Sequence, residues 1–198
     1  MLTFEAHAGE AIRDILSDVA RLRITVFREW PYLYDGDLDY EERYLAGYCD
    51  CDSSVVITAR HEGRIVGAAT GMRMDHADSD YSDAFALTEL PADQTFYMAE
   101  SVLLPEYRGQ GAGHSFFALR ERHALSLGLR WAVFCAVIRP EDHPRRPPGA
   151  RSLEPFWQGR GYQPLLGVTA RFSWKDLDED AESRKPMQFW IRDLEATT

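Results

Sequence analysis

A glycine-rich run in the middle of the chain is the sequence feature with the clearest chemical consequence. The run consists of Tyr107, Arg108, Gly109, Gln110, Gly111, Ala112 and Gly113. Glycines that open a helix leave several backbone N–H groups pointing at one site, and the helix dipole adds positive potential there. A glycine turn can also serve only for tight packing. We predict the chemical role, a seat for a pyrophosphate group, because a predicted strand runs directly into the loop and a helix follows it.

Two other kinds of phosphate-binding loop are excluded by their spacing. No Lys-Ser or Lys-Thr pair follows the glycines, which argues against a P-loop nucleotidase. A dinucleotide-binding fingerprint opens the first strand–helix unit of a parallel sheet. Here at least three predicted strands precede the loop.

The elements that must position this loop follow from hydrophobic periodicity and turn residues. Strands are expected over residues 2–7, 54–60, 64–74, 95–104, 130–138, 162–174 and 186–193. Helices are expected over residues 9–27, up to about 48, 83–87, 111–127, and between a Ser152 cap and Gly161. In the helix over 111–127, Phe116, Phe117, Arg120 and Ala124 share one face, and Glu121 points elsewhere. The pattern predicts a mixed α/β or α+β domain.

Composition limits the function further. The chain of 198 residues is 45% hydrophobic with a formal net charge of −10, which argues against nucleic-acid binding and could favour cationic substrates. No apolar run is long enough for a membrane helix, and the chain start shows no signal peptide. Three cysteines (Cys49, Cys51 and Cys135) fit reduced thiols in the cytoplasm. No cysteine or histidine spacing predicts a metal site.

The loop over residues 108–113 and the order of the elements resemble the GNAT superfamily of acetyltransferases, whose signature is Arg/Gln-x-x-Gly-x-Gly/Ala. The resemblance is strongest over residues 97–138 and resumes at 156–162; segments 27–34 and 185–190 are similar to a bacterial subgroup. It implies one domain over residues 1–198, built on a mixed, mostly antiparallel sheet of about seven strands flanked by helices. It also implies acetyl-CoA as the acyl donor.

The resemblance further implies where acetyl-CoA would bind. The backbone N–H groups of the loop would hold the pyrophosphate, and the pantetheine arm would lie along the strand before it, where the strand over 130–138 splays away. The N–H of Leu103 or a neighbour would polarise the thioester carbonyl. The residues implied to bind the donor are Val102, Leu103, Leu104, Arg108, Gly109, Gln110, Gly111, Ala112, Gly113 and His114.

Glu100 is the candidate general base. Strand alternation predicts that it shares one face with Phe96, Met98, Val102 and Leu104. A carboxylate in apolar company is poorly solvated and therefore takes up a proton more readily. The alternative is a buried structural ion pair, for example with Arg73 or Arg120.

The tyrosine that often protonates the departing thiolate in the family is replaced here by Trp157, whose indole N–H is not an acid. Tyr162, Tyr107, Cys135 or solvent could take over, although packing is the simpler role for each side chain. The asparagine that commonly follows residues 130–138 in the family is missing.

The acceptor is expected between the first helices and the open end of the sheet. Trp30, Tyr32, Tyr34 and Asp35 are the candidate substrate-binding residues. This segment continues into Asp37, Asp39, Glu41 and Glu42, which would suit a cationic amine, or it forms only a solvated turn and helix cap. Arg139, Arg145 and Arg146 could instead meet the 3′-phosphate or an acidic acceptor.

Together these features predict an N-acetyltransferase that moves an acetyl group from acetyl-CoA to a primary amine, most simply of a small molecule, through a ternary complex. The alternatives are a non-catalytic acyl-CoA sensor on the same fold and an enzyme that uses longer acyl groups. No nucleic acid, membrane or metal is expected as a partner, and a homodimer stays open.

Overall fold

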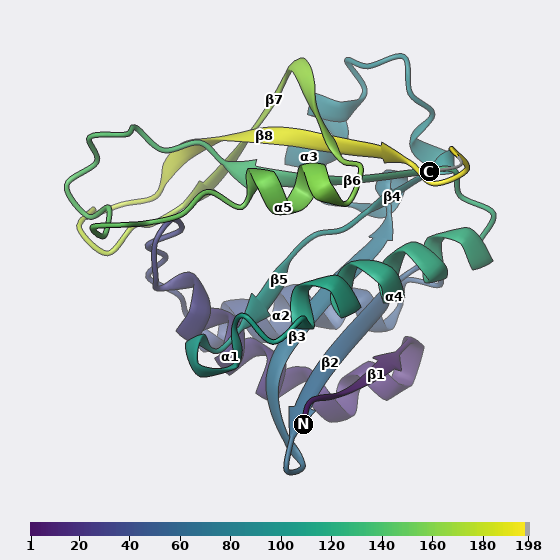
Figure 1. Cartoon of the computed structure of the whole chain (residues 1–198), viewed down its shortest axis with the longest axis horizontal. Coiled ribbons are helices and arrows are strands. Elements are labelled where there is room, and N and C mark those ends of the chain that lie inside the picture. The colour runs from purple at the N-terminus through teal and green to yellow at the C-terminus, as the bar shows by residue number, and fades with distance from the viewer. Residues whose placement is uncertain (197–198) are drawn as a thin grey trace.

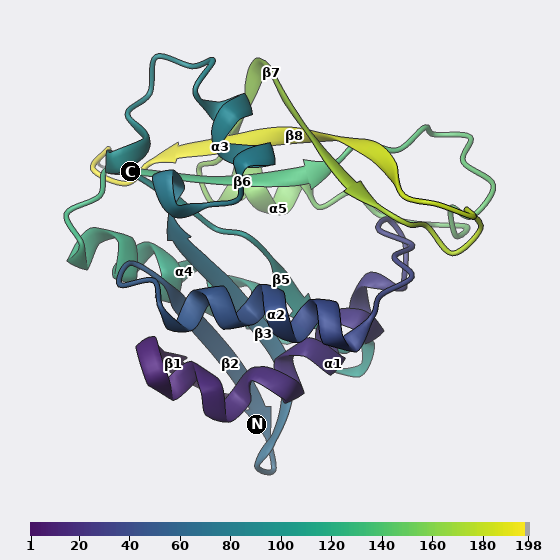
Figure 2. The same ribbon diagram turned by 180° about the vertical axis from the view of Figure 1, so that it is seen from behind.

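The protein is described by a computed structural model that covers residues 1–196 and contains one eight-stranded sheet with helices on both faces (Figures 1 and 2). The strands follow the order β1-β2-β3-β4-β6-β8-β7, and β5 pairs with β3 beside this path. The strands are β1 (Thr3–His7), β2 (Val55–His61), β3 (Arg64–Arg73), β4 (Thr95–Tyr97), β5 (Ser101–Leu103), β6 (Trp131–Val137), β7 (Gln163–Trp174) and β8 (Ser183–Asp193). This architecture confirms the predicted mixed, mostly antiparallel sheet flanked by helices.

Helices divide between the two faces of the sheet. The helices are α1 (Leu16–Phe27), α2 (Leu38–Cys49), α3 (Ser79–Phe85), α4 (Ala112–Ser126) and α5 (Glu154–Gly159). The first three lie on one face, and α4 and α5 lie on the other (Figures 1 and 2). The predicted helix over residues 9–27 is partly wrong, because its first part, Gly9–Ile15, is a 3₁₀ helix. Among the described residues, no helix combines the length and the apolar character needed to cross a membrane.

The parallel pairing of β4 with β6 is the point at which the sheet opens. The register joins Thr95 to Trp131 and Tyr97 to Val133, and the N–H of Met98 still donates to the carbonyl of Val133 at 2.8 Å. Beyond this point β5 pairs with β3, whereas β6 keeps only its pairing with β8, which runs along its whole length. Figure 1 shows β5 and β6 diverging from here. The two strands therefore part just before the glycine loop.

The predicted strand over residues 95–104 is interrupted, which corrects the sequence interpretation. The N–H of Ala99 donates to the carbonyl of Thr70, and the N–H of Thr70 donates to the carbonyl of Glu100, both at 3.1 Å. Ala99 and Glu100 thus both oppose Thr70 of β3. Such an arrangement is a β-bulge. The bulge separates β4 from β5.

The bulge also reverses the alternation of side chains, so the prediction of one shared face is wrong. Phe96 and Met98 pack in the cluster that contains Phe116 of α4. Val102 and Leu104 belong instead to the cluster on the α1 and α2 side. One extra residue in a strand moves the side chains that follow it to the opposite face.

Helix α4 departs from prediction at one position. Phe116, Phe117, Arg120 and Ala124 are buried, as expected. Glu121, which was expected to point elsewhere, is also buried and is paired with Arg160 at 2.6 Å and Arg192 at 3.2 Å. Its carboxylate is buried because Arg160, directly after α5, and Arg192 of β8 supply these cations.

Candidate active site

The glycine loop enters α4 with its backbone amides uncommitted. Gly109 and Gly111 have φ values of +75° and +83°, which only glycine adopts without strain. The first helical N–H with an acceptor is that of Ser115, which donates to the carbonyl of Gly111 at 3.3 Å. Within residues 1–196, the N–H groups of residues 109–114 have no protein acceptor. Six successive donors at a helix N-terminus fit a diphosphate.

Strand β5 presents a further backbone donor beside this loop. The N–H of Leu104 donates to the carbonyl of Val66 at 3.0 Å, and Glu100 and Thr70 are bonded in the same ladder. Because an antiparallel ladder uses alternate residues, the N–H of Leu103 faces away from β3, toward the side on which β6 has parted. The Arg108 guanidinium donates to the carbonyl of Leu103 at 3.1 Å and to Glu29 at 2.8 Å. The backbone N–H of Leu103 therefore has the orientation that a donor to the thioester oxygen would need.

A buried arginine holds the bulge in place. Arg120 of α4 is 1% exposed and donates to the carbonyls of Thr70 and Glu100 at 3.0 and 2.9 Å. It also donates to the hydroxyl of Ser101 at 2.7 Å. Burial lowers the pKa of Arg120 to about 10. These bonds fix the backbone from which the Glu100 side chain projects toward α1 and α2.

The Glu100 carboxylate lies in a buried cluster of three charges. Arg23 of α1 forms ion pairs with Glu100 and, through Nε, with Glu41 of α2. Tyr44 donates its hydroxyl proton to Glu100 Oε2 at 3.4 Å. The alternative role considered for Glu100, a buried structural ion pair, is present in the structure, but the example partners Arg73 and Arg120 were wrong. The guanidinium that meets the carboxylate belongs to Arg23 of α1. Arg120 donates to the backbone carbonyl of Glu100 and not to its side chain.

A cavity of about 280 Å³ opens beside this cluster. Its walls come from α1, α2, the segment between them, Tyr81 of α3, Tyr97 of β4, and the facing ends of β7 and β8. Three of the four candidate acceptor residues, Tyr32, Tyr34 and Asp35, line it together with Glu100. Trp30 is not among the lining residues, and its ring lies 5.2 Å from that of His143. The cavity thus joins the candidate base to most of the predicted acceptor wall.

An ion pair fixes the segment between α1 and α2 against the sheet. Arg139 donates to the carbonyls of Pro31 and Tyr32 at 2.8 and 2.7 Å, and it forms a bidentate pair with Asp176 at 2.6 and 2.9 Å. The bonds hold Tyr32 at the cavity. Arg139 therefore contacts the chain itself, where a contact with the 3′-phosphate or an acidic acceptor had been one alternative.

The side chains considered as proton donors to the thiolate lie outside this cavity's lining. The hydroxyl of Tyr162 donates to Glu121 at 3.0 Å, and burial raises the pKa of Tyr162 well above its usual value. Burial likewise raises the pKa of Cys135. Tyr107 lies beside His61, with ring centroids 5.2 Å apart. The Trp157 indole packs against Phe134 and Trp190.

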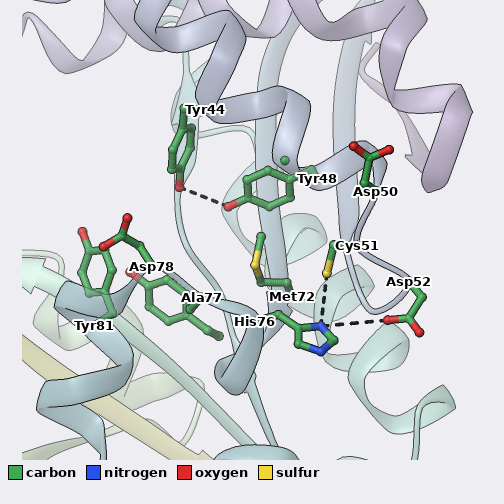
Figure 3. Close-up of a pocket in the computed structure, with 12 residues that line it drawn as sticks. Tyr44, Tyr48, Asp50, Cys51, Asp52, Met72, His76, Ala77, Asp78 and Tyr81 are labelled. Carbon is green, nitrogen blue, oxygen red and sulfur yellow. Dashed lines mark hydrogen bonds and ion pairs between the residues drawn. The ribbon is translucent and has the colours of Figure 1, made fainter.

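A second cavity of about 710 Å³ adjoins the first and contains a cysteine, an aspartate and a histidine close together (Figure 3). His76 Nδ1 lies 3.3 Å from the Cys51 sulfur, 3.9 Å from Asp52 Oδ1 and 3.0 Å from the Ser53 hydroxyl. The Arg73 guanidinium, which can only donate, lies 2.9 Å from His76 Nε2.

Sequence reasoning missed Arg23 and Tyr44, and it named Glu41 only as one of several acidic residues that would suit a cationic amine. Two of the three have a signal in the periodicity, since Arg23 follows Val19 by one helical turn and Glu41 precedes Leu45 by one turn, on the buried faces of α1 and α2. A charged residue at a core-facing position requires a partner. The periodicity does not identify that partner, which lies on another helix.

A comparison with protein-family profiles and a comparison with solved structures both find acetyltransferases. The sequence profile described as Acetyltransferase (GNAT) family matches residues 20–146. No curated protein is significantly similar in sequence.

Among solved structures, yncA of Salmonella typhimurium with its cofactor acetyl-CoA is 11% identical, with coverage of 100% of this chain and 96% of that one and a TM-score of 0.61. An N-acetyltransferase of Staphylococcus aureus Mu50 is 13% identical, with coverage of 98% and 99% and a TM-score of 0.60. The ribosomal-protein-alanine N-acetyltransferase of Brucella melitensis is 12% identical, with coverage of 96% and 99% and a TM-score of 0.58.

Proposed function

Because the chain belongs to the GNAT acetyltransferase family, we propose that it forms a single domain that transfers an acetyl group from acetyl-CoA to a primary amine. The observation that carries the proposal is the run of uncommitted amides at residues 109–114, directly after the point where β5 and β6 part. The solved complex of yncA with acetyl-CoA adds support from a protein of the same fold.

The donor would be held by main-chain groups. The amides of Gly109, Gln110, Gly111, Ala112, Gly113 and His114 would bind the pyrophosphate, with Arg108 supporting the loop. The pantetheine arm would run beside Val102, Leu103 and Leu104. The Leu103 N–H would donate to the oxygen on which negative charge develops, in the manner of an oxyanion hole.

Glu100 would act as the general base. Glu100 lines the same cavity as the candidate acceptor residues Tyr32, Tyr34 and Asp35. The acceptor enters as an ammonium ion and gives a proton to Glu100, directly or through one water. Its nitrogen then attacks the thioester carbon and a C–N bond forms, with negative charge on the thioester oxygen. As the C–S bond breaks, the nitrogen gives a second proton to solvent and the departing thiolate takes a proton from solvent.

The cavity supports a small acceptor. Its volume of about 280 Å³ is at the lower end of ligand-binding pockets. Tyr32, Tyr34 and Asp35 would contact the acceptor. Trp30, which does not line the cavity, has no direct part in this proposal.

Thiol release from acetyl-CoA in the presence of an amine panel tests the proposal. We expect thiol release that depends on the amine, with intersecting initial-velocity lines as a ternary complex requires. Tight donor binding without any amine-dependent thiol would refute catalysis and favour an acyl-CoA sensor.

A further inference from the structure

One oxygen of Glu41 is buried at the acceptor cavity without a partner. The residue is 0% exposed and lines the cavity, and Oε2 is bonded to Arg23. Among the described residues, no donor makes a well-formed hydrogen bond to Oε1. The hydroxyl to consider is that of Tyr34, whose pKa is raised by burial and by its interaction with Glu41. An unsatisfied buried carboxylate oxygen is costly, so a ligand that donates to it gains an unusually strong contact.

The charge of the cluster specifies what that ligand should be. Glu41 and Glu100 supply two negative charges, and Arg23 supplies one positive charge. With these formal charges, the buried cluster has a net charge of −1. A single ammonium group would neutralise it, and transfer of the ammonium proton to Glu100 would keep the site neutral during attack.

The other acidic groups of this segment either have a partner or lie outside the cavity lining, as exposed Asp39 does. Asp35 is paired with Lys175 at 2.9 Å, and Asp37 caps α2 by accepting from the N–H of Tyr40. Glu42 accepts from the Ser17 hydroxyl on the α1 side and does not line the cavity. Glu182 also lines the cavity, but it is exposed, so water can solvate its carboxylate. Among the described acidic residues of this wall, Glu41 is therefore the buried one with an oxygen that neither a cation nor a well-formed hydrogen bond meets.

The cavity offers no comparable place for an anion. Its lining cations are Arg23 and Lys175, and both are paired with carboxylates. The remaining wall is largely aromatic, including Tyr34, Tyr40 and Trp174. Aromatic faces attract cations and offer a carboxylate no donor apart from the tyrosine hydroxyls.

We propose that Glu41 Oε1 anchors the ammonium group of the acceptor, and that the acceptor is an amine without a carboxylate, of the kind that decarboxylation of an amino acid produces. This inference rests on the proposed function and narrows its substrate class. An intact amino acid would carry its carboxylate into a wall that already has an excess of negative charge.

Matched pairs of compounds test the inference. The pairs are tyramine with tyrosine, phenethylamine with phenylalanine, and cadaverine with lysine, offered to protein saturated with CoA for calorimetric binding and to acetyl-CoA for turnover. We expect the amine of at least one pair to bind at least tenfold more tightly than its amino acid and to have the higher kcat/KM. Equal or better binding of the amino acids, or binding of neither member of any pair, would overturn the inference.

Two substitutions on α2 locate the anchor. In Glu41→Gln we expect KM for the preferred amine to rise about 10- to 100-fold, the range for loss of a charge-assisted hydrogen bond, with CoA affinity unchanged. Glu42→Gln makes the same change of charge one residue away and should leave KM within twofold. Equal KM values for the two variants would refute the role of Glu41.

Failure of this inference can be distinguished from failure of the proposed function. Loss of CoA binding by the wild-type protein would reject the acyl-CoA assignment itself, whereas CoA binding combined with a preference for amino acids would reject only the inference. Thermal unfolding and CoA affinity check that each variant is folded. The comparison of matched pairs on the wild-type protein holds even if Glu41→Gln is unstable.

Discussion

Adding one methyl group to the glycine loop, by Gly111→Ala, should weaken donor binding, whereas the same change at Gly128 should affect stability alone. Gly111 and Gly128 lie at opposite ends of α4, both are left-handed with φ of +83° and +74°, and at both a Cβ would meet no atom within 4 Å. The strain of an alanine in this conformation, about 1–2 kcal/mol, is therefore the same at both. Gly111→Ala and Gly128→Ala should lower stability equally.

Their effects on coenzyme A should differ. Relief of strain at Gly111 turns the amides that we expect to hold the pyrophosphate, and the loss of one hydrogen bond to a charged group, about 1.5–3 kcal/mol, weakens binding roughly 10- to 150-fold. Calorimetric titration with CoA should show this loss in Gly111→Ala, and wild-type affinity in Gly128→Ala. Equal affinities in the two variants, with matched unfolding midpoints, would refute the loop as the donor site.

Two further predictions concern the base and the buried phenols. Glu100→Gln should lower kcat about 100-fold and leave CoA affinity unchanged, as removal of a general base typically does; turnover within twofold of wild type would exclude Glu100 from the mechanism. Burial raises the pKa of Tyr44, Tyr81, Tyr97 and Tyr162 well above the usual value. Their contribution to stability is complete below pH 10 and is lost as the pH rises through the folded-state values. Absorbance at 295 nm should show fewer ionised tyrosines at pH 11 in the folded protein than in urea, and identical titrations would contradict this burial.

The order of the elements and the glycine loop could be predicted from the sequence because both depend on local signals. Turn residues, caps and apolar periodicity located every strand of the sheet to within a few residues, apart from the one that the bulge divides. The family resemblance added the topology of the sheet, and the structure agrees with it.

The bulge could not be predicted from local pattern. It depends on Thr70 and on Arg120, which lie 29 residues before and 21 residues after Ala99 in the chain, and residues 95–104 alone read as an uninterrupted strand. The ion pair of Glu100 with Arg23 could not be predicted for the same reason, since it joins α1 to the bulge. Periodicity identifies a buried charge, and only the packing of the helices shows which partner neutralises it.

The central claim is that the amides before α4 bind the diphosphate of an acyl-coenzyme A. Proton–nitrogen correlation spectra of the labelled protein, recorded during titration with CoA, test it most directly. We predict that the largest amide shifts, in the downfield direction expected for new hydrogen bonds to phosphate, fall within residues 109–114. Saturating CoA that leaves these amides unmoved, or that shifts another surface instead, would contradict the claim.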